Sequence, residues 1–382
     1  MVDMGKWLVY AAMMTNAESF EIYLVAAPGT ESSLLAEANA LNFPQPKLVA
    51  GGVTLQGHWT DVWRANLQLR QTPRILARLG AFHVSHLAQL DKLSHKFPWG
   101  NFLRKDVAVR VEVTCKKSRI YHAGAAAERI EKALREELGA MITEDAQVCV
   151  KARIENNLCT ISLDSSGEAL HKRGHKLGVG KAPMRETMAA LFLRQCGYTG
   201  AESVLDPMCG SGTFVIEAAE IALGLAPGRA RHFAFEQLKS FDAKAWKAMR
   251  DALKLKDSAF TFYGSDRDAG AITAATANAA RAGVETLCTF TRRSVSESVP
   301  PQAPPGLVIM NPPYGARIGD KKKLMALYAA VGHVLRERFV GWRVGIITND
   351  NALARATGLA LKKGAPVLHG GLRVWLYQAT LS

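Results

Sequence analysis

The stretch that most constrains the fold of this chain is an apolar run at residues 307–310 that ends in Asn311, Pro312, Pro313 and Tyr314. Proline has a fixed φ and no backbone N–H, so a strand that reaches two prolines cannot continue its hydrogen-bond ladder and ends in a stiff turn. Asn311 can accept a hydrogen bond from an amine, the carbonyl of Pro312 can accept a second, and Tyr314 can stack on a ring. The pattern predicts a buried strand that ends in a narrow slot for a planar heterocycle with an exocyclic amine. A plain strand-to-loop turn is the alternative.

A glycine turn upstream of this slot predicts a cofactor site. Residues 204–213 read Val-Leu-Asp-Pro-Met-Cys-Gly-Ser-Gly-Thr, which is typical of a short buried strand, a tight turn and the start of a helix expected over 214–223. Gly210 and Gly212 allow the backbone to pass close to a ligand, where the helix N-terminus presents unpaired N–H groups. The turn lacks the Gly-Lys-Ser/Thr of a P-loop and the third glycine of a dinucleotide site, so it suits S-adenosylmethionine better than ATP or NAD. A nucleotide-binding loop and an ordinary turn are the alternatives. The candidate cofactor residues in this segment are Asp206, Pro207, Met208, Gly210, Gly212 and Thr213.

A second acidic position supports the cofactor site. Residues 260–266 predict a strand that ends in Asp266, and a helix rich in alanine is expected over 271–282. A carboxylate at the tip of the strand beside the glycine turn is where ribose hydroxyls bind in doubly wound sheets, so we assign that role to Asp266. Asp268 is better placed to cap the helix that follows.

Several segments together resemble the RlmL-type guanine-N2 RNA methyltransferases that carry a THUMP domain. The resemblance is carried by residues 206–219 (DPMCGSGTFVIEAA), 264–269 (GSDRDA), 278–283 (NAARAG) and 311–319 (NPPYGARIG), and it extends upstream to 163–175 and 182–187. It is strong from about residue 160 to 350 and weaker before that. It implies an α/β C-terminal domain of the Rossmann-like class I S-adenosylmethionine-dependent methyltransferase type, with a mostly parallel seven-stranded sheet. It also implies that α+β ferredoxin-like and THUMP modules precede that domain.

The resemblance implies roles for individual residues as well. Asp206, Gly210, Gly212 and Asp266 would contact S-adenosylmethionine, with Asn311 beside it, and the catalytic residues Asn311, Pro312, Pro313 and Tyr314 would hold the target base. One position departs from the family pattern, because Ser294 stands where the family usually has an aspartate that meets the adenine amine. Either Ser294 or the backbone would take over that contact, or the affinity for the cofactor is lower.

The implied reaction is methylation of the exocyclic N2 amine of a guanosine, with 23S ribosomal RNA as the first candidate substrate. A transfer-RNA guanine-N2 methyltransferase shares these motifs and is the alternative. A DNA adenine-N6 methyltransferase also uses Asn-Pro-Pro-Tyr, although the RNA-type N-terminal module argues against it. A non-catalytic RNA-binding factor is a further alternative, supported only by Ser294.

The charge of the chain favours a polyanionic partner such as RNA. The formal net charge is +14, from 48 Lys and Arg against 34 Asp and Glu. A basic protein that binds no nucleic acid is the alternative, and a solvated charge run is the alternative for each cluster. The candidate RNA-binding residues lie in three basic clusters, at Lys116, Lys117 and Arg119, at Lys172 and Arg173, and at Lys321, Lys322 and Lys323.

Six cysteines contain no Cys-x-x-Cys pair, so the sequence predicts reduced thiols and no metal site. Cys209 lies inside the glycine turn, where packing explains it better than nucleophilic attack, because methyl transfer to an amine needs no covalent enzyme intermediate. No apolar stretch is long enough to span a membrane, and the N-terminus lacks the form of a signal peptide, so we expect a cytoplasmic protein.

The hydrophobic pattern and the resemblance together imply the following organisation, in which the THUMP assignment of 70–165 follows from the resemblance as much as from periodicity and a generic α+β domain is its alternative. Residues 1–15 are an extension, 16–69 a ferredoxin-like α+β domain, 70–165 a THUMP RNA-binding domain and 166–382 the methyltransferase domain. The expected strands are 20–26, 47–55, 107–114, 147–155, 158–164, 344–348, 365–368 and 372–380, and the expected helices of the N-terminal half are 31–42, 60–69 and 123–138. Asn156 and Asn157 suit a two-residue hairpin turn at positive φ, and residues 222–258 are expected to form a helical insertion.

Overall fold

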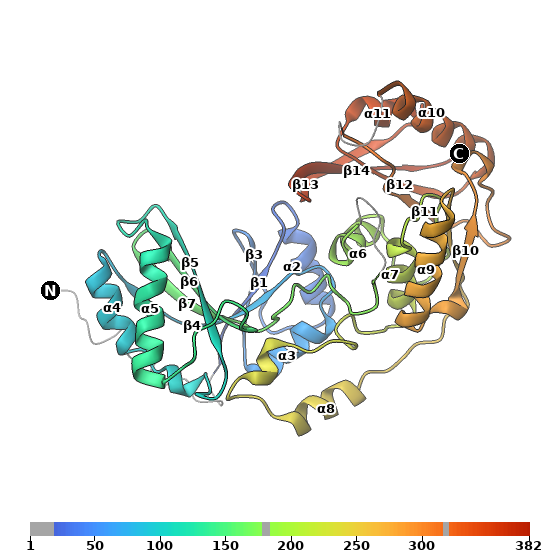
Figure 1. Cartoon of the computed structure of the whole chain (residues 1–382). Coiled ribbons are helices and arrows are strands. Elements are labelled where there is room, and N and C mark those ends of the chain that lie inside the picture. Colours follow the sequence, from blue (N-terminus) through green and yellow to red (C-terminus); the bar gives the residue numbers. More distant parts are fainter. Residues whose placement is uncertain (1–18, 178–183, 316–320) are drawn as a thin grey trace. The chain divides into compact units, whose positions relative to one another are not determined.

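The computed structural model describes residues 19–177, 184–315 and 321–382, and these divide into two compact units (Figure 1). The first unit contains residues 19–25, 35–170 and 231–252, and the second contains residues 26–34, 171–230 and 253–382. The extension predicted at 1–15 and the first residues of the segment 182–187 lie outside the described residues.

One mixed sheet forms the core of the first unit. Its strand order is β2-β3-β1-β4-β7-β6-β5 among the described residues. Strand β4 pairs with β1 on one side and with β7 on the other, both antiparallel, so the sheet runs without a break across the predicted boundary at residue 70. The elements are β1 (Phe20–Val25), α2 (Glu31–Ala40), β2 (Lys47–Val49), β3 (Gly52–Gly57), α3 (Trp59–Gln68), β4 (Ile75–His83), α4 (Leu87–His95), β5 (Val109–Lys116), α5 (Ala123–Leu138), β6 (Val148–Glu155) and β7 (Leu158–Asp164).

The turn chemistry of this unit largely follows the sequence. Asn156 and Asn157 join β6 to β7 at φ values of 52° and 63°, which confirms the predicted hairpin. The single strand expected over 47–55 is wrong, because the chain turns there and β2 pairs antiparallel with β3. Gly51 makes this turn possible at φ 79°, and a Cβ on Gly52 would lie 2.1 Å from the carbonyl oxygen of Leu24.

Residues 231–252 pack into the first unit although the sequence places them between strands of the second. The expected helical insertion over 222–258 contains only a 3-10 turn, η2 (Ala234–Gln237), and α8 (Ala243–Asp251) among its helical elements. Aromatic rings anchor it, since Trp63 of α3 lies 6.0 Å from the ring of Phe235 and 5.8 Å from that of Phe241. Trp246 of α8 meets Phe235 edge-on at 5.1 Å, so this segment completes the aromatic core of the unit.

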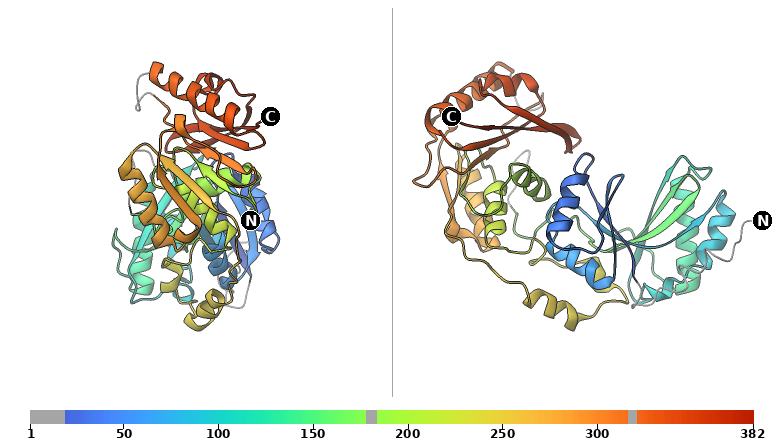
Figure 2. Two further views of the ribbon diagram at one scale, coloured as in Figure 1. Left: turned by 90° about the vertical axis from the view of Figure 1, so that its right-hand side faces the viewer. Right: turned by 180° about the vertical axis from the view of Figure 1, so that it is seen from behind.

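The second unit contains a seven-stranded sheet with the order β10-β9-β8-β11-β12-β14-β13, as far as the structure describes the chain. The first five strands in this order are parallel, and β14 runs antiparallel to its two neighbours β12 and β13, which confirms the expected mostly parallel sheet. Helix α7 packs against α6 and α9, both α7 and α9 contact β9 and β10, and α10 packs against α11, which contacts β12 (Figure 2). The elements are α6 (Glu186–Gln195), β8 (Val204–Asp206), α7 (Thr213–Ala222), β9 (Phe262–Asp266), α9 (Ala269–Ala282), β10 (Cys288–Arg292), η4 (Val295–Glu297), β11 (Leu307–Met310), α10 (Lys321–Arg338), β12 (Arg343–Thr348), α11 (Asn351–Ala356), β13 (Lys362–His369) and β14 (Leu372–Thr380).

The strand order of this unit creates a switch point between β8 and β11. From β8 the chain moves outward to β9 and β10, and then returns to the other side of β8 as β11. In an open α/β sheet the connections diverge at such a point and leave a crevice at the carboxyl ends of the two strands. All four side chains of β11 are fully buried, which explains the apolar run that precedes Asn311.

Candidate active site

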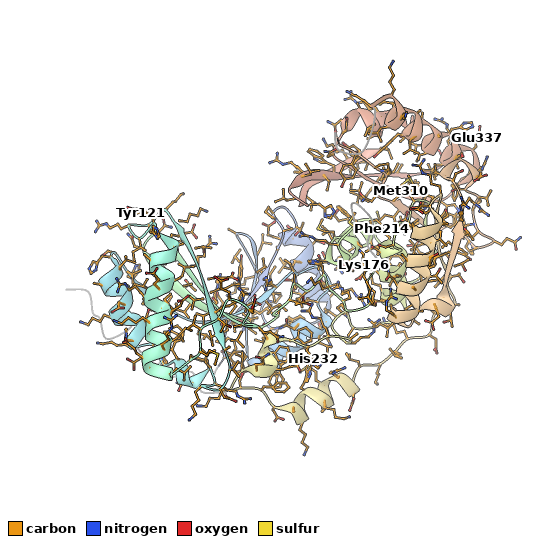
Figure 3. The ribbon with its side chains drawn as sticks, viewed as in Figure 1. Tyr121, Lys176, Phe214, His232, Met310 and Glu337 are labelled. Atoms are coloured by element: carbon orange, nitrogen blue, oxygen red, sulfur yellow. The ribbon has the colours of Figure 1, made fainter. Side chains whose placement is uncertain are left out.

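The two motifs found in the sequence lie at the carboxyl ends of adjacent parallel strands. Leu307 pairs with Val204 and Val308 with Leu205, so the glycine turn after β8 and the Asn-Pro-Pro-Tyr turn after β11 leave the same edge of the sheet. In Figure 3, Phe214 in the first turn of α7 and Met310 at the end of β11 mark the two motifs. Both motifs therefore lie at the switch point, which is where open α/β sheets bind their ligands.

The glycine turn is held against β9 by backbone hydrogen bonds. Met208 N donates to Asp206 Oδ1 at 3.0 Å, Gly210 N donates to Asp266 Oδ2 at 3.0 Å, and Cys209 N donates to the carbonyl of Ser265 at 2.9 Å. Asp268 N donates to the other oxygen of Asp266 at 3.0 Å. Each carboxylate oxygen of Asp266 keeps a second lone pair, so this side chain can fix the turn and still accept from a hydroxyl.

The two glycines of the turn serve different purposes. Gly212 begins α7 at φ 83°, and a Cβ there would lie 3.1 Å from the Cβ of Ala275, so this glycine lets the turn pack closely against α9. Gly210 also has a positive φ, 51°, but a Cβ there would meet nothing within 4 Å. Gly210 thus borders open space at the edge of the sheet. This arrangement fits a ligand that passes over the backbone of the turn.

Asp206 is a buried carboxyl whose charge is suppressed. Burial raises its pKa to about 8, with a smaller contribution from the nearby charge of Asp266, and the N–H of Met208 lowers it only in part. The side chain is consequently protonated at neutral pH, and a cation placed beside it would favour the ionised form. Burial also raises the pKa of the Cys209 thiol, which agrees with a packing role.

Local predictions at the start of α9 are confirmed. Asp268 is the N-cap, and its side chain accepts from Gly270 N at 2.9 Å. From the same helix, the buried side-chain amide of Asn278 donates to the carbonyl of Ser211 at 3.0 Å and so stabilises the glycine turn. The sequence had suggested Asn278 only as part of a resemblance.

Asn311 brings an unpartnered acceptor to the slot. Its Oδ1 is buried and has no hydrogen-bond partner among the described residues. Pro312 is buried and Pro313 half-buried, so the turn is rigid as well as enclosed. Tyr314 is 9% exposed, so most of its ring is enclosed by the protein, and burial raises the pKa of its hydroxyl to about 12.

Ser294 is committed to a local contact. It begins η4, and its hydroxyl lies 2.8 Å from Oε2 of Glu297, whose pKa this hydrogen bond lowers. A contact between Ser294 and an adenine amine stays a prediction. Glu297 was not predicted to take part here, although Ser-x-x-Glu at 294–297 is the signal of a capping box.

The basic segment 171–176 is largely packed into the second unit and does not form a continuous exposed patch. Arg173 is buried and lies 3.5 Å from Glu217 of α7 with both side chains 1% exposed, so its assignment to RNA binding is wrong. His175 faces Glu220 at 3.7 Å. Lys172, by contrast, is exposed.

Lys176 lies next to the glycine turn. The sequence did not predict this position. Its Nζ donates to Thr213 Oγ1 at 2.9 Å and lies 3.5 Å from Glu186 of α6, next to Phe214 in Figure 3. Burial lowers the pKa of this lysine despite the carboxylate of Glu186. Thr213 therefore engages Lys176 and anchors α7.

The other predicted RNA-binding residues are exposed. Lys116 ends β5, and Lys117 and Arg119 follow it beside the β6–β7 turn, where Arg119 N donates to Asn157 Oδ1 at 2.8 Å. Lys321, Lys322 and Lys323 form the first turn of α10. Three cations oppose the helix dipole there, so helix stability does not explain them.

The described residues contain neither a metal site nor a membrane-spanning helix. Within 19–177, 184–315 and 321–382 there is no cluster of His, Cys, Asp and Glu that could hold a metal ion. No helix in the same residues is long and apolar enough to cross a membrane. The six cysteines are free thiols.

Comparison with known proteins gives consistent matches across both units. Residues 173–374 match a family model described as "RMKL-like, methyltransferase domain", and residues 21–76 match one described as "RlmL ferredoxin-like domain". A Synechocystis protein with the provisional name of RNA methyltransferase is 30% identical over 368 residues, which cover 94% of this chain and 96% of that protein.

Two further matches concern a longer relative and a solved structure. Ribosomal RNA large subunit methyltransferase K/L of Psychromonas ingrahamii is 30% identical over 375 residues, which cover 94% of this chain but 50% of that protein. This chain thus spans half the length of that relative. The crystal structure of a provisionally named methyltransferase in complex with SAH superposes with a TM-score of 0.84 and 26% identity, covering 96% of this chain and 99% of that one.

Proposed function

The chain belongs to the RlmL-like methyltransferase family, and on that premise we propose that it uses S-adenosylmethionine to methylate the N2 amine of a guanosine in RNA. Large-subunit ribosomal RNA is the proposed substrate, because the relative from Psychromonas ingrahamii is named for it. The proposal includes a THUMP-type RNA-binding module within residues 70–165 and a cytoplasmic location.

The observation that carries the proposal is the unpartnered Oδ1 of Asn311 at the switch point. A buried acceptor without a partner costs about 1–3 kcal/mol, so it persists where a ligand supplies the missing donor. The glycine turn with its open space at Gly210 leaves the same sheet edge. An amine donor and a methyl donor would therefore meet between these two turns.

The proposed cofactor residues fit S-adenosylmethionine. Asp266 can accept hydrogen bonds from the ribose hydroxyls, Asp206 can form an ion pair with a cationic group, and Gly210 leaves room for the ligand. The bound cofactor supplies an electrophilic methyl group attached to a sulfonium. It needs no activation by a covalent enzyme intermediate, which agrees with the buried, protonated thiol of Cys209.

The residues of the slot would act by positioning and electrostatics. Asn311 Oδ1 and the carbonyl of Pro312 accept the two protons of the amine, and this directs the nitrogen lone pair toward the methyl group. The same two oxygens stabilise the positive charge that develops on nitrogen, and Tyr314 encloses the ring. After transfer the extra proton leaves to water, since no general base is needed before attack.

A base inside a helix cannot reach this enclosed slot, so the target guanosine must be unpaired or flipped out. Unstacking costs a few kcal/mol, and contact with an aromatic ring offsets about 1–3 kcal/mol of that cost. Lys321 and Lys323 at the start of α10 follow the slot closely in sequence and are proposed to hold phosphates next to the target. Lys116, Lys117 and Arg119 of the first unit are proposed to contact RNA phosphates as well.

Asn311→Ala tests the proposal. An unmodified transcript of large-subunit ribosomal RNA is incubated with S-adenosylmethionine, and the product nucleosides are identified by mass spectrometry. We expect N2-methylguanosine from the wild-type protein and none from Asn311→Ala, with S-adenosylmethionine binding unchanged in calorimetry. Asn101→Ala, an exposed asparagine of the first unit, is the control and should leave both measurements unchanged. Turnover retained by Asn311→Ala would overturn the assignment.

A further inference from the structure

The strand beside β11 ends in a second unpartnered amide. Asn349 directly follows β12 (Arg343–Thr348), and its Oδ1 is buried without a hydrogen-bond partner in the part of the chain that the structure describes. Asn311 Oδ1 is in the same situation at the end of β11. Adjacent strands of the sheet thus end in two buried amide oxygens for which the described residues supply no donor.

Strand register places these two residues at the same edge. Strands β11 and β12 are parallel, with Met310 beside Ile346, so continuation of the register brings Asn349 beside Pro313. Neighbouring strands lie about 4.8 Å apart. The amide nitrogen of Asn349 is 3.8 Å from the point where a Cβ on Gly315 would lie, so the side chain approaches the turn that follows Tyr314.

The backbone on either side of Asn349 is fixed. Thr348 is fully buried, and its hydroxyl accepts from Asp350 N at 3.2 Å. Asp350 caps α11 by accepting from Ala352 N at 2.7 Å. These contacts explain why Thr348 and Asp350 stand at their positions, but neither contact involves the side chain of Asn349.

The acceptors match one purine edge and conflict with another. Guanine presents N1–H beside its N2 amine, so its Watson–Crick edge offers donors next to the reacting nitrogen. Adenine presents the lone pair of N1 beside its N6 amine, and a second buried carbonyl oxygen would then face an acceptor. A site built from two acceptors at this edge therefore selects guanine over adenine.

We propose that Asn349 is a specificity-determining residue whose Oδ1 accepts the N1–H of the target guanine while Asn311 and Pro312 hold the N2 amine. The inference rests on the proposed function and adds how the site rejects adenine. A site that hydrogen-bonds a group of its substrate discriminates strongly against analogues that lack the group, because the buried partner is then left unpaired.

The test compares Asn349→Ala and Asn349→Asp with the wild-type protein on the unmodified large-subunit transcript. We expect Asn349→Ala to lower kcat/KM for N2-methylguanosine by about 10- to 100-fold, as for loss of one hydrogen bond at a buried site. The ratio of N2-methylguanosine to N6-methyladenosine should fall at the same time. Asn349→Asp keeps an acceptor oxygen and should retain that ratio. Calorimetry with S-adenosylmethionine checks that each variant is folded.

The outcomes separate the inference from the proposed function. If the wild-type protein forms N2-methylguanosine and Asn349→Ala leaves both rate and ratio unchanged, the inference is overturned and the proposed function stands. If the wild-type protein forms only N6-methyladenosine, both are overturned. If Asn349→Ala fails to bind S-adenosylmethionine, the isosteric variant Asn349→Asp tests the inference instead. A lower ratio of N2-methylguanosine to N6-methyladenosine in Asn349→Asp would contradict the acceptor role.

Discussion

A methyl group added at Gly210 should weaken cofactor binding in addition to its cost to the fold. Gly210→Ala places a Cβ at φ 51° in space where nothing lies within 4 Å. An L-residue in this left-handed region loses about 1–2 kcal/mol of stability. If the cofactor crosses this space, the added methyl also overlaps the ligand, and the cost of such overpacking is about 1–3 kcal/mol. The dissociation constant for S-adenosylmethionine should then rise by about 5- to 150-fold.

Gly283→Ala is the matched control for this experiment. Gly283 ends α9 at φ 70° and also has nothing within 4 Å of the position of its Cβ, so it carries the same backbone cost without a ligand nearby. Urea unfolding should show similar losses of stability for the two variants, whereas calorimetry should show weaker binding for Gly210→Ala alone. Equal affinities in the two variants would refute the conclusion that the open space at Gly210 holds the cofactor.

Three further outcomes are expected. Below pH 8, S-adenosylmethionine binding should release a proton from Asp206, because the pKa of this carboxyl, about 8 in the free protein, falls when a cation is bound. The affinity for S-adenosylmethionine should therefore rise with pH up to about 8 and then level off. Calorimetry in buffers of different ionisation enthalpy measures this release, and Asp206→Asn should abolish it. Asp268→Ala removes the N-cap of α9 and should lower the free energy of unfolding by about 1 kcal/mol in urea titrations. An unchanged urea midpoint would contradict this expectation. Lys321→Gln and Lys323→Gln should each reduce the slope of log affinity for RNA against log salt concentration by about 1, and an unchanged slope would place the phosphates elsewhere.

Features set by short stretches of chain were predictable from the sequence. The Asn156-Asn157 turn, the Asp268 cap and the turns after β8 and β11 each depend on residues within a few positions of one another. Glycine, proline and asparagine restrict local backbone conformation strongly enough to show in the sequence.

Features set by distant pairing were not predictable. A charge pattern cannot distinguish an exposed arginine from a buried one, and Arg173 was misassigned because its partner, Glu217, lies on a helix later in the chain. Asn349 was overlooked because its relation to Asn311 exists only once β11 and β12 pair. Lys176 likewise acquires its meaning from Thr213 and Glu186.

The aromatic segment at 231–252 has a consequence for how the protein can be made. Trp63 is translated early, but the rings of Phe235 and Phe241 that cover it leave the ribosome only after the first strand and helix of the catalytic sheet. Domains usually fold as units during synthesis, beginning at the N-terminus. Here the N-terminal unit must wait for a piece of its core, so a chain cut after residue 170 would expose Trp63 and should aggregate.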